Sequence, residues 1–194
     1  MSQWVTLRKH LHKHPELSGQ ESTTAAYILE QFAKFNPDRS YINLGGTGLA
    51  FCFDAKEQGP NVLFRSELDA LPIHEVNTFA HKSIHEGVSH KCGHDGHMAI
   101  LMALAAKVVE NPPQKGSVTF LFQPAEETGE GAIAVVEDQQ FEQFRPDYCF
   151  ALHNLPGHPL GDVLIRKGGF NCASRGEPSV VSGVAVSMVV PLKL

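Results

Sequence analysis

The sequence predicts an α/β fold in which helices cover both faces of a mixed, largely parallel sheet. Apolar runs of strand length alternate with helix-length segments along the chain, a pattern that favours a sheet with helices on its faces. The run 117–124 is apolar at successive positions, as in a central strand that is buried on both sides. A length of 194 residues suits one domain, or one domain and a fragment of a second.

The composition is that of a globular protein and argues against two kinds of partner. Hydrophobic residues make up 42% of the chain and charged residues 19%, and the net charge is -5 with histidines neutral. Without an excess of basic residues, we expect no nucleic-acid partner. No segment reaches the roughly 18 apolar residues that span a bilayer, and residues 1–17 lack the apolar core of a signal peptide. We therefore expect a cytoplasmic protein without a membrane partner.

Two helices are expected at the N-terminus. Apolar residues at helical spacing predict the first helix over 3–13, and Pro15 ends it. Ser18 is followed three residues later by Glu21, which is the pattern of a capping box. We expect this box to open a second helix that runs to about residue 35.

The remaining elements alternate between strands and helices. The apolar runs predict strands at 47–54, 61–68, 117–124, 147–154 and 161–168. Residues 97–110 form a helix-length segment that ends at a pair of prolines, and a short helix is expected within 129–138. Polar loops follow several of these strands. Because open α/β sheets form their sites at the carboxyl ends of strands, we expect these loops to share one crevice.

The segment HKCGHDGH, residues 90–97, is the densest group of metal-binding side chains. Cys92 and His94 lie two residues apart, and Gly93 between them allows the backbone to turn sharply. Thiolate and imidazole are ligands of zinc-type metals. Glycines that alternate with such residues form poor helices, strands and cores, so the segment favours metal binding or catalysis. A structural zinc site is the main alternative, but such sites usually use paired clusters, and one cluster is present here.

The adjacent Glu126 and Glu127 follow the strand 117–124 and can divide two roles between them. Their side chains diverge, so one can bind a metal while the other faces the substrate water. A metal lowers the pKa of its bound water toward about 7, and a neighbouring carboxylate can pass the proton to a leaving amine. These residues therefore suit amide hydrolysis. Taken alone, an adjacent glutamate pair or the single His153 is more often a solvated or packed feature.

The other histidines have ordinary interpretations. Three lie two residues apart on the first helix, do not share one face, and are expected at the surface or helix end: His10, His12 and His14. Four lie in a polar, turn-rich loop and are expected to be mainly solvated: His74, His81, His85 and His90.

Five motifs in a fixed order resemble one enzyme family. They are RKHLHKHPELSGQE, RSELDALPI, HKCGHDGHMA, FLFQPAEETGEGA and ALHNLPG. Together they resemble the metal-dependent aminoacylase/carboxypeptidase-type amidohydrolases. The more similar branch holds hippurate hydrolases, N-acyl-amino-acid amidohydrolases and plant hydrolases of auxin–amino acid conjugates. The resemblance covers about residues 4–175, and the order of five motifs makes it specific.

The resemblance implies a metallopeptidase-like catalytic domain that cleaves a small N-acyl amino acid with two divalent metal ions. Zinc or manganese is expected, with cobalt and nickel as further options. The matching motif positions imply these metal ligands: Cys92, His94, Glu127 and His153. Glu126 matches the general base, and Asp69 in ELDALP matches a site carboxylate that supports the metal centre.

The sequence departs from the family after GGFNCASRG. Family members are about twice as long, and their later part carries a lid and dimerisation domain and one more histidine ligand. We expect residues 1–167 to be the N-terminal part of the catalytic domain and 168–194 to be an aberrant stub, as a frameshift or early stop would leave. The family's oligomer surface would then be missing. A catalytically inactive metal-binding fragment and a zinc-stabilised module without catalysis remain the alternatives.

Overall fold

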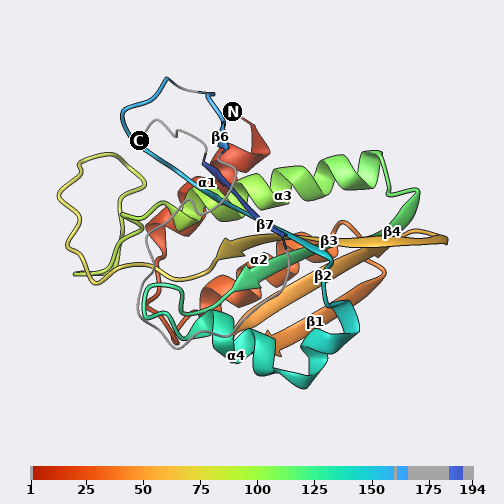
Figure 1. The fold of residues 1–194 in the computed structure, drawn as a ribbon. Helices are drawn as coiled ribbons and strands as arrows, with labels where there is room; N and C mark the ends of the chain where they lie inside the picture. The colour runs from red at the N-terminus through yellow and green to blue at the C-terminus, as the bar shows by residue number, and fades with distance from the viewer. Residues whose placement is uncertain (1, 160, 166–183, 190–194) are drawn as a thin grey trace.

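A mixed sheet forms the centre of the molecule (Figure 1). The computed structural model describes residues 2–159, 161–165 and 184–189, and within them the sheet has seven strands in the order β1-β2-β4-β3-β5-β7-β6. The strands are β1 (Arg39–Leu44), β2 (Gly48–Asp54), β3 (Glu57–Glu67), β4 (Lys115–Gln123), β5 (Tyr148–His153), β6 (Leu164–Ile165) and β7 (Val184–Val189). Strands β4, β3 and β5 are parallel neighbours, whereas β1 and β2 extend the sheet in antiparallel fashion.

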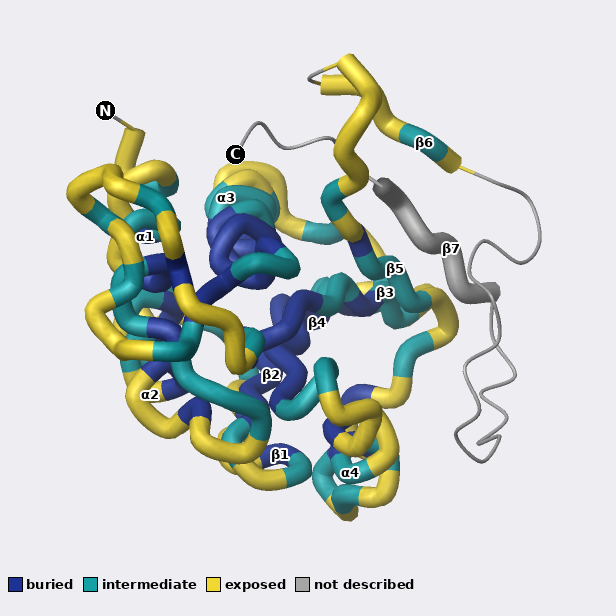
Figure 2. Tube along the Cα trace, turned by 90° about the vertical axis from the view of Figure 1, so that its left-hand side faces the viewer, coloured by how far each residue is buried: buried dark blue, intermediate teal, exposed yellow. Residues whose placement is uncertain are grey.

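Helices cover both faces of this sheet, which confirms the expected fold class. The helices are α1 (Gln3–Lys13), α2 (Ser22–Ala33), α3 (His94–Glu110), α4 (Gly131–Glu137) and the 3-10 helix η1 (Gln139–Phe144). Figure 2 shows α1, α2 and α3 on one side of the sheet and α4 on the other. Among the described residues, no helix combines the length and the apolar character that crossing a bilayer requires.

Aromatic residues of the central strands join the helices to the sheet. Phe32 of α2 stacks on Phe51 of β2 with ring centroids 4.0 Å apart, and both side chains are fully buried. Phe120 and Phe122 of β4 lie in the same cluster, while Leu121 between them faces the cluster under α4 and η1. Strand β4 is therefore buried on both faces, as its continuous apolar run predicted.

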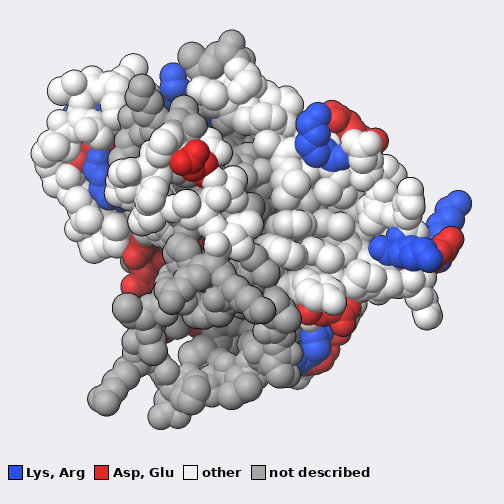
Figure 3. Space-filling model, turned by 45° about the horizontal axis from the view of Figure 1, so that its top comes forward, with Lys and Arg blue, Asp and Glu red and all other residues white. Residues whose placement is uncertain are grey.

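Charged side chains are few on the face drawn in Figure 3 and lie in small groups of mixed sign. Exposed ion pairs occur within the described surface, such as Lys115 Nζ with Glu57 Oε2 at 3.2 Å. Exposed pairs of this kind contribute only about 0–1 kcal/mol each. The stability of the fold therefore depends on its buried groups.

The predicted capping box at Ser18 and Glu21 is wrong. Glu21 is the cap residue of α2, but its side chain makes no cap hydrogen bond. The Glu16 carboxylate instead accepts a hydrogen bond from the Thr24 N–H at 2.7 Å. Ser18 Oγ donates to the carboxylate of Asp69 at 2.7 Å. Contacts with distant loops have replaced the local pattern that the spacing predicted.

Three elements were not expected from the sequence, namely β1, η1 and β7. Strand β1 is an outer strand with alternating exposure, so its apolar signal is weak. Helix α3 begins at His94, three residues earlier than expected, directly after Gly93 in the left-handed region at φ +101°. The expected strand 161–168 is β6 over two residues, and residues 166–168 lie outside the described part.

A buried ionic network joins α1 to the start of α3 and to the loop before it. His12 is buried, with Nδ1 donating to Asp95 Oδ2 at 3.0 Å and Nε2 donating to Glu75 Oε1 at 3.1 Å. Arg8 Nε lies 3.0 Å from the same Asp95 oxygen, and Lys91 Nζ lies 2.7 Å from Glu75 Oε1. The expectation that His12 is a surface residue is therefore wrong, because two acidic groups outside the helix hold it inside.

The loop histidines differ in burial. His74 and His85 are exposed as expected, but His90 is only 2% exposed, so the expectation of solvation is wrong there. Burial lowers the pKa of His90 to about 4 despite the nearby Asp95 carboxylate. His12 behaves in the opposite way. Burial alone would lower its pKa, but hydrogen bonds and charge interactions with Asp95 and Glu75 raise it above 6.5.

Replacing His12 with Gln is expected to lower the free energy of unfolding by about 3 kcal/mol at pH 5.5. This lies at the low end of the cost of removing one partner of a buried pair, because Arg8 and Lys91 still pair the two carboxylates. The folded-state pKa of His12 exceeds the unfolded value near 6.5. The contribution is therefore complete below about pH 6.5 and is lost as pH rises through the folded-state pKa.

Denaturant unfolding of the wild type and of His12→Gln at several pH values between 5.5 and 9 measures this effect. His74→Gln is the matched control, since the His74 side chain is 60% exposed. A difference between wild type and His12→Gln that stays constant or grows with pH would contradict the expectation.

Candidate metal centre

The site residues predicted from the sequence converge at the carboxyl ends of β3, β4 and β5. They come from four segments: Asp69 after β3, Cys92 and His94 at the start of α3, Glu126 and Glu127 after β4, and His153 at the end of β5. This is the edge at which open α/β sheets form their sites. The loops were expected to share one crevice, and the fold brings them together.

Three of the expected ligands can reach one point. One donor atom from each of Cys92, His94 and Glu127 lies within 4.8 Å of the other two. His94 Nε2 is 3.6 Å from Glu127 Oε1. His153 joins this group through its Nε2 atom, which lies 3.4 Å from Cys92 Sγ. A thiol, two imidazoles and a carboxylate therefore surround one small volume.

This donor set fits a zinc-type divalent ion. Within the described residues, Glu127 Oε1 is buried and has no hydrogen-bond partner. An unpaired buried acceptor costs about 1–3 kcal/mol, a cost that a bound cation would offset. His94 Nδ1 donates to the backbone carbonyl of Asp69 at 2.7 Å, so its Nε2 faces the carboxylates. Fixing one ring nitrogen in this way leaves the other available as a ligand.

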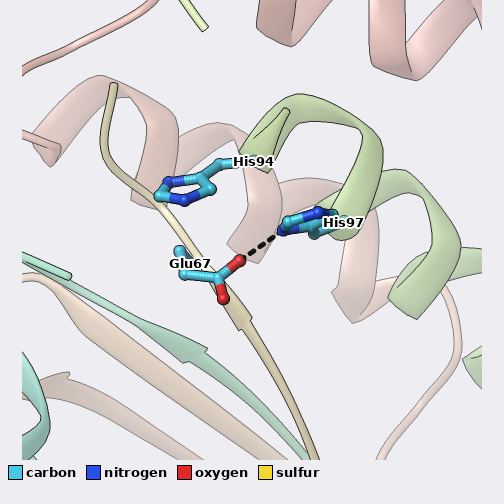
Figure 4. Close-up of side chains that lie close together, drawn as sticks. All are labelled: Glu67, His94 and His97. Atoms are coloured by element: carbon cyan, nitrogen blue, oxygen red, sulfur yellow. Dashed lines mark hydrogen bonds and ion pairs between the residues drawn. The ribbon is translucent and has the colours of Figure 1, made fainter. Parts of the chain in front are cut away.

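A second group of possible ligands adjoins the first (Figure 4). It consists of Glu67, His94 and His97, all buried. His97 Nδ1 donates to Glu67 Oε2 at 2.7 Å, and Arg65 Nη1 donates to the other Glu67 oxygen at 2.7 Å. The remaining nitrogen of His97 lies 2.8 Å from Asn154 Oδ1. Glu67 and His97 are already fully hydrogen-bonded, so the group around Cys92 is the better metal site.

Sequence reasoning did not select Glu67 or His97, although both carry a positional signal. Glu67 lies two residues before Asp69 in RSELDALP, and His97 lies three residues after His94 on the same helix. Residues three apart on a helix share a face, so His97 was bound to lie near His94. Knowing that a strand ends at Glu67 would have completed the inference.

Asp69 supports the site from its position after β3. Its Oδ2 atom accepts hydrogen bonds from Ser18 Oγ at 2.7 Å and from the Glu127 N–H at 2.9 Å. Burial would raise the pKa of Asp69, but the hydrogen bonds with His94, Glu127 and Ser18 lower it to about 2. Asp69 is therefore a carboxylate that orients two of the expected ligands.

Glu126 lies at the mouth of the site and is 37% exposed at its side chain. Its Oε2 atom is 3.7 Å from His94 Nε2, and its Oε1 atom is 4.0 Å from Arg65 Nη2. Burial raises the pKa of Glu126, although the positive charges of Arg65 and His94 oppose the rise. A carboxylate with a raised pKa that water can reach suits proton transfer.

The electrostatics of the pocket favour a cation between the ligands. Hydrogen bonds with His153 and His94 lower the pKa of the Cys92 thiol, although burial opposes this. The hydrogen bond with Cys92 raises the pKa of His153 to about 9. A thiol beside such imidazoles is shifted toward the thiolate, the form in which cysteine binds metal.

A buried acid fixes the loop that carries the two glutamates. Ala125 lies at φ +44°, an unfavourable region for a residue with a side chain, and its N–H donates to Glu21 Oε1 at 2.8 Å. Glu21 also accepts hydrogen bonds from the Gly19 N–H at 2.9 Å and from Thr47 Oγ1 at 2.8 Å. The side chain that was expected to cap α2 therefore positions the site loop.

Comparisons with known proteins agree with this geometry. Residues 63–189 match the family model of peptidase family M20/M25/M40. An N-acetyldiaminopimelate deacetylase of Oceanobacillus iheyensis is 38% identical over 168 residues, which is 87% of this chain and 45% of the relative. An N-acetyl-L-cysteine deacetylase of Bacillus subtilis is 37% identical over 171 residues, or 86% of this chain and 39% of the relative.

A solved structure shares the fold. The crystal structure of a dinuclear metal-binding peptidase of the M20 family from Bacillus subtilis superposes with a TM-score of 0.79 at 33% identity. The similarity covers 85% of this chain and 46% of that one. The chain therefore spans less than half the length of the relatives it resembles.

Replacing Glu21 with Ala is expected to destabilise the protein by about 3 kcal/mol. The change leaves three donors without their acceptor, and each unpaired buried group costs about 1–3 kcal/mol before water or local movement compensates. Denaturant unfolding measures the loss, with Glu30→Ala on the exposed face of α2 as the control. Equal stabilities of the two variants would show that Glu21 does not hold the loop.

Proposed function

The chain belongs to peptidase family M20/M25/M40, and on this basis we propose that it hydrolyses the amide bond of N-acyl amino acids in a metal-dependent reaction. The observation that carries the proposal is the group of Cys92, His94 and Glu127, with an unpaired buried carboxylate oxygen beside a second glutamate. The names of the two deacetylases support a small N-acyl amino acid as the substrate.

Four residues would hold the metal, which we propose to be a pair of divalent ions. The ligands are Cys92, His94, Glu127 and His153. The thiolate favours zinc, while manganese, cobalt and nickel suit the remaining nitrogen and oxygen donors. When bound, such ions polarise the substrate carbonyl and make water acidic enough to attack near neutral pH.

Glu126 is the general base in this proposal. Its carboxylate takes a proton from the attacking water as the new C–O bond forms. It returns that proton to the nitrogen when the C–N bond breaks, so a carboxylic acid and a free amino acid are released. The raised pKa of Glu126 supports both steps, because the group can hold the proton between them.

Asp69 keeps the ligands in place while Glu126 moves the proton. Its backbone carbonyl fixes the His94 ring, and its carboxylate holds the Glu127 amide. We propose a positioning role for Asp69, since its carboxylate lies behind His94 and is fully buried. Second-layer partners of this kind are typically worth about 10–100-fold in metal affinity or activity.

The proposal extends to the organisation and location of the chain. Residues 1–167 would form the N-terminal part of the catalytic domain, and 168–194 a segment that differs from the family's lid. A cytoplasmic location and a small-molecule substrate complete the proposal.

Replacing Glu126 with Gln is expected to abolish hydrolysis of an N-acetyl amino acid while metal content stays at the wild-type level. The amide keeps the size of the side chain but cannot accept the proton. The matched variant Glu127→Gln should lose metal and activity together. Amino-acid release and metal content, measured on the same samples with added zinc or manganese, separate the two cases. Metal binding without turnover in the wild type would favour a catalytically inactive metal-binding fragment.

Replacing Cys92 with Ala is expected to weaken zinc binding by at least about tenfold, since the thiolate is a ligand of the proposed site. Competition with a coloured chelator measures the affinity. Cys149→Ala is the control, because Cys149 is half-buried on β5 and burial raises its pKa. Equal losses in the two variants would exclude Cys92 as a specific ligand.

A further inference from the structure

Behind the proposed ligands, four polar side chains form one continuous chain of hydrogen bonds, which we call the Asn154 clasp. Arg65 Nη1 donates to Glu67 Oε1 at 2.7 Å, and Glu67 Oε2 accepts from His97 Nδ1 at 2.7 Å. His97 Nε2 lies 2.8 Å from Asn154 Oδ1. Figure 4 shows the middle of the clasp, where Glu67 of β3 and His97 of α3 face each other. The clasp therefore ties β3 and α3 to the end of β5.

The clasp has a rigid foundation. Arg65 Nε also donates to Gln123 Oε1 of β4 at 2.8 Å, so the neighbouring strand fixes the guanidinium. Glu67 and His97 are 1% and 0% exposed, and both oxygens and both ring nitrogens have partners. Such a network holds one geometry, because breaking any link leaves a buried polar group unpaired.

Gly93 provides the space in which Asn154 sits. A Cβ atom at Gly93 would lie 2.4 Å from Asn154 Oδ1, closer than real contacts allow. Gly93 also has φ +101°, which disfavours any residue with a side chain. The glycine between Cys92 and His94 therefore brings the ligand loop and Asn154 into direct contact.

His153, next to Asn154, is exposed and needs an external support for its ring. Its Nδ1 donates to the Asn154 carbonyl at 2.7 Å, and its ring meets the His97 ring edge-on with centroids 5.2 Å apart. Its other nitrogen lies 3.4 Å from Cys92 Sγ. The contacts that orient His153 thus lead to Asn154 and His97.

We propose that Asn154 is a positioning residue, and that the clasp holds His153 against Cys92 before any metal binds. The inference rests on the proposed function in one respect, namely that His153 is a metal ligand. It assigns to Glu67 and His97 the support of this histidine in place of metal binding. The end of β5 would otherwise carry its ligand on a half-exposed segment with an unfixed ring.

The first test uses the metal-free full chain. Backbone hydrogen exchange over residues 150–156 is expected to speed up several-fold in Asn154→Ala. Asn154→Asp keeps an oxygen acceptor for His97 and should exchange as slowly as the wild type. Asn61→Ala is the matched control, because Asn61 makes side-chain hydrogen bonds at the far end of β3. Equal exchange in Asn154→Ala and Asn61→Ala would overturn the clasp.

The second test measures zinc affinity by chelator competition and the visible spectrum of the cobalt-loaded protein. Asn154→Ala is expected to bind zinc about 10–100-fold more weakly than Asn61→Ala. Its cobalt spectrum should shift toward that of His153→Ala, a change that lower stability alone does not produce. Faster exchange with unchanged affinity and spectrum would overturn the positioning role.

A third variant separates the clasp from a metal site at Glu67 and His97. His97→Gln should bind the same number of zinc ions at saturation with lower affinity. Loss of one ion at saturation would instead make His97 a ligand and overturn the proposal. If the wild type binds no zinc, the proposed function fails, and the exchange comparison alone decides whether the clasp holds His153.

Discussion

The backbone and side chain of Asp69 form the junction on which the site depends. The carbonyl accepts from His94, and the carboxylate accepts from Ser18 and from the Glu127 amide. Three segments that are far apart in the sequence therefore meet at one residue directly after β3. The parallel pairing of β3 with β4 makes this possible, because their carboxyl ends lie at the same edge of the sheet.

Buried acids build the surroundings of the site in the same way. Glu21 holds the loop before the two glutamates, Glu67 holds His97, and His12 links Glu75 with Asp95. Each carboxylate faces donors from elements distant in sequence. Because an unpaired charge in a dry interior is very costly, these contacts fix which loops lie together more than they add net stability. The metal ligands lie in the space that these fixed loops surround.

The fold and the candidate ligands could largely be predicted from the sequence. The apolar run of β4 and the helix-length segments follow local rules of pattern and length, and the density of ligand-type residues around Cys92 is visible without a structure. Histidines were harder to place. His12 and His90 are both buried, although their local sequence is polar, because their environment is formed by residues far along the chain. The capping pattern at Ser18 failed for the same reason.

The sequence by itself determined the α/β pattern, the order of the motifs and the identity of the candidate ligands. These depend on hydrophobic periodicity and on residue chemistry, which are local properties. Only the tertiary structure decided that Glu67 and His97 are satisfied by Arg65 and Asn154, while Glu127 retains an unpaired oxygen. Hydrogen-bond partners are chosen by strand order and loop contact, and neither is encoded at any single position of the chain.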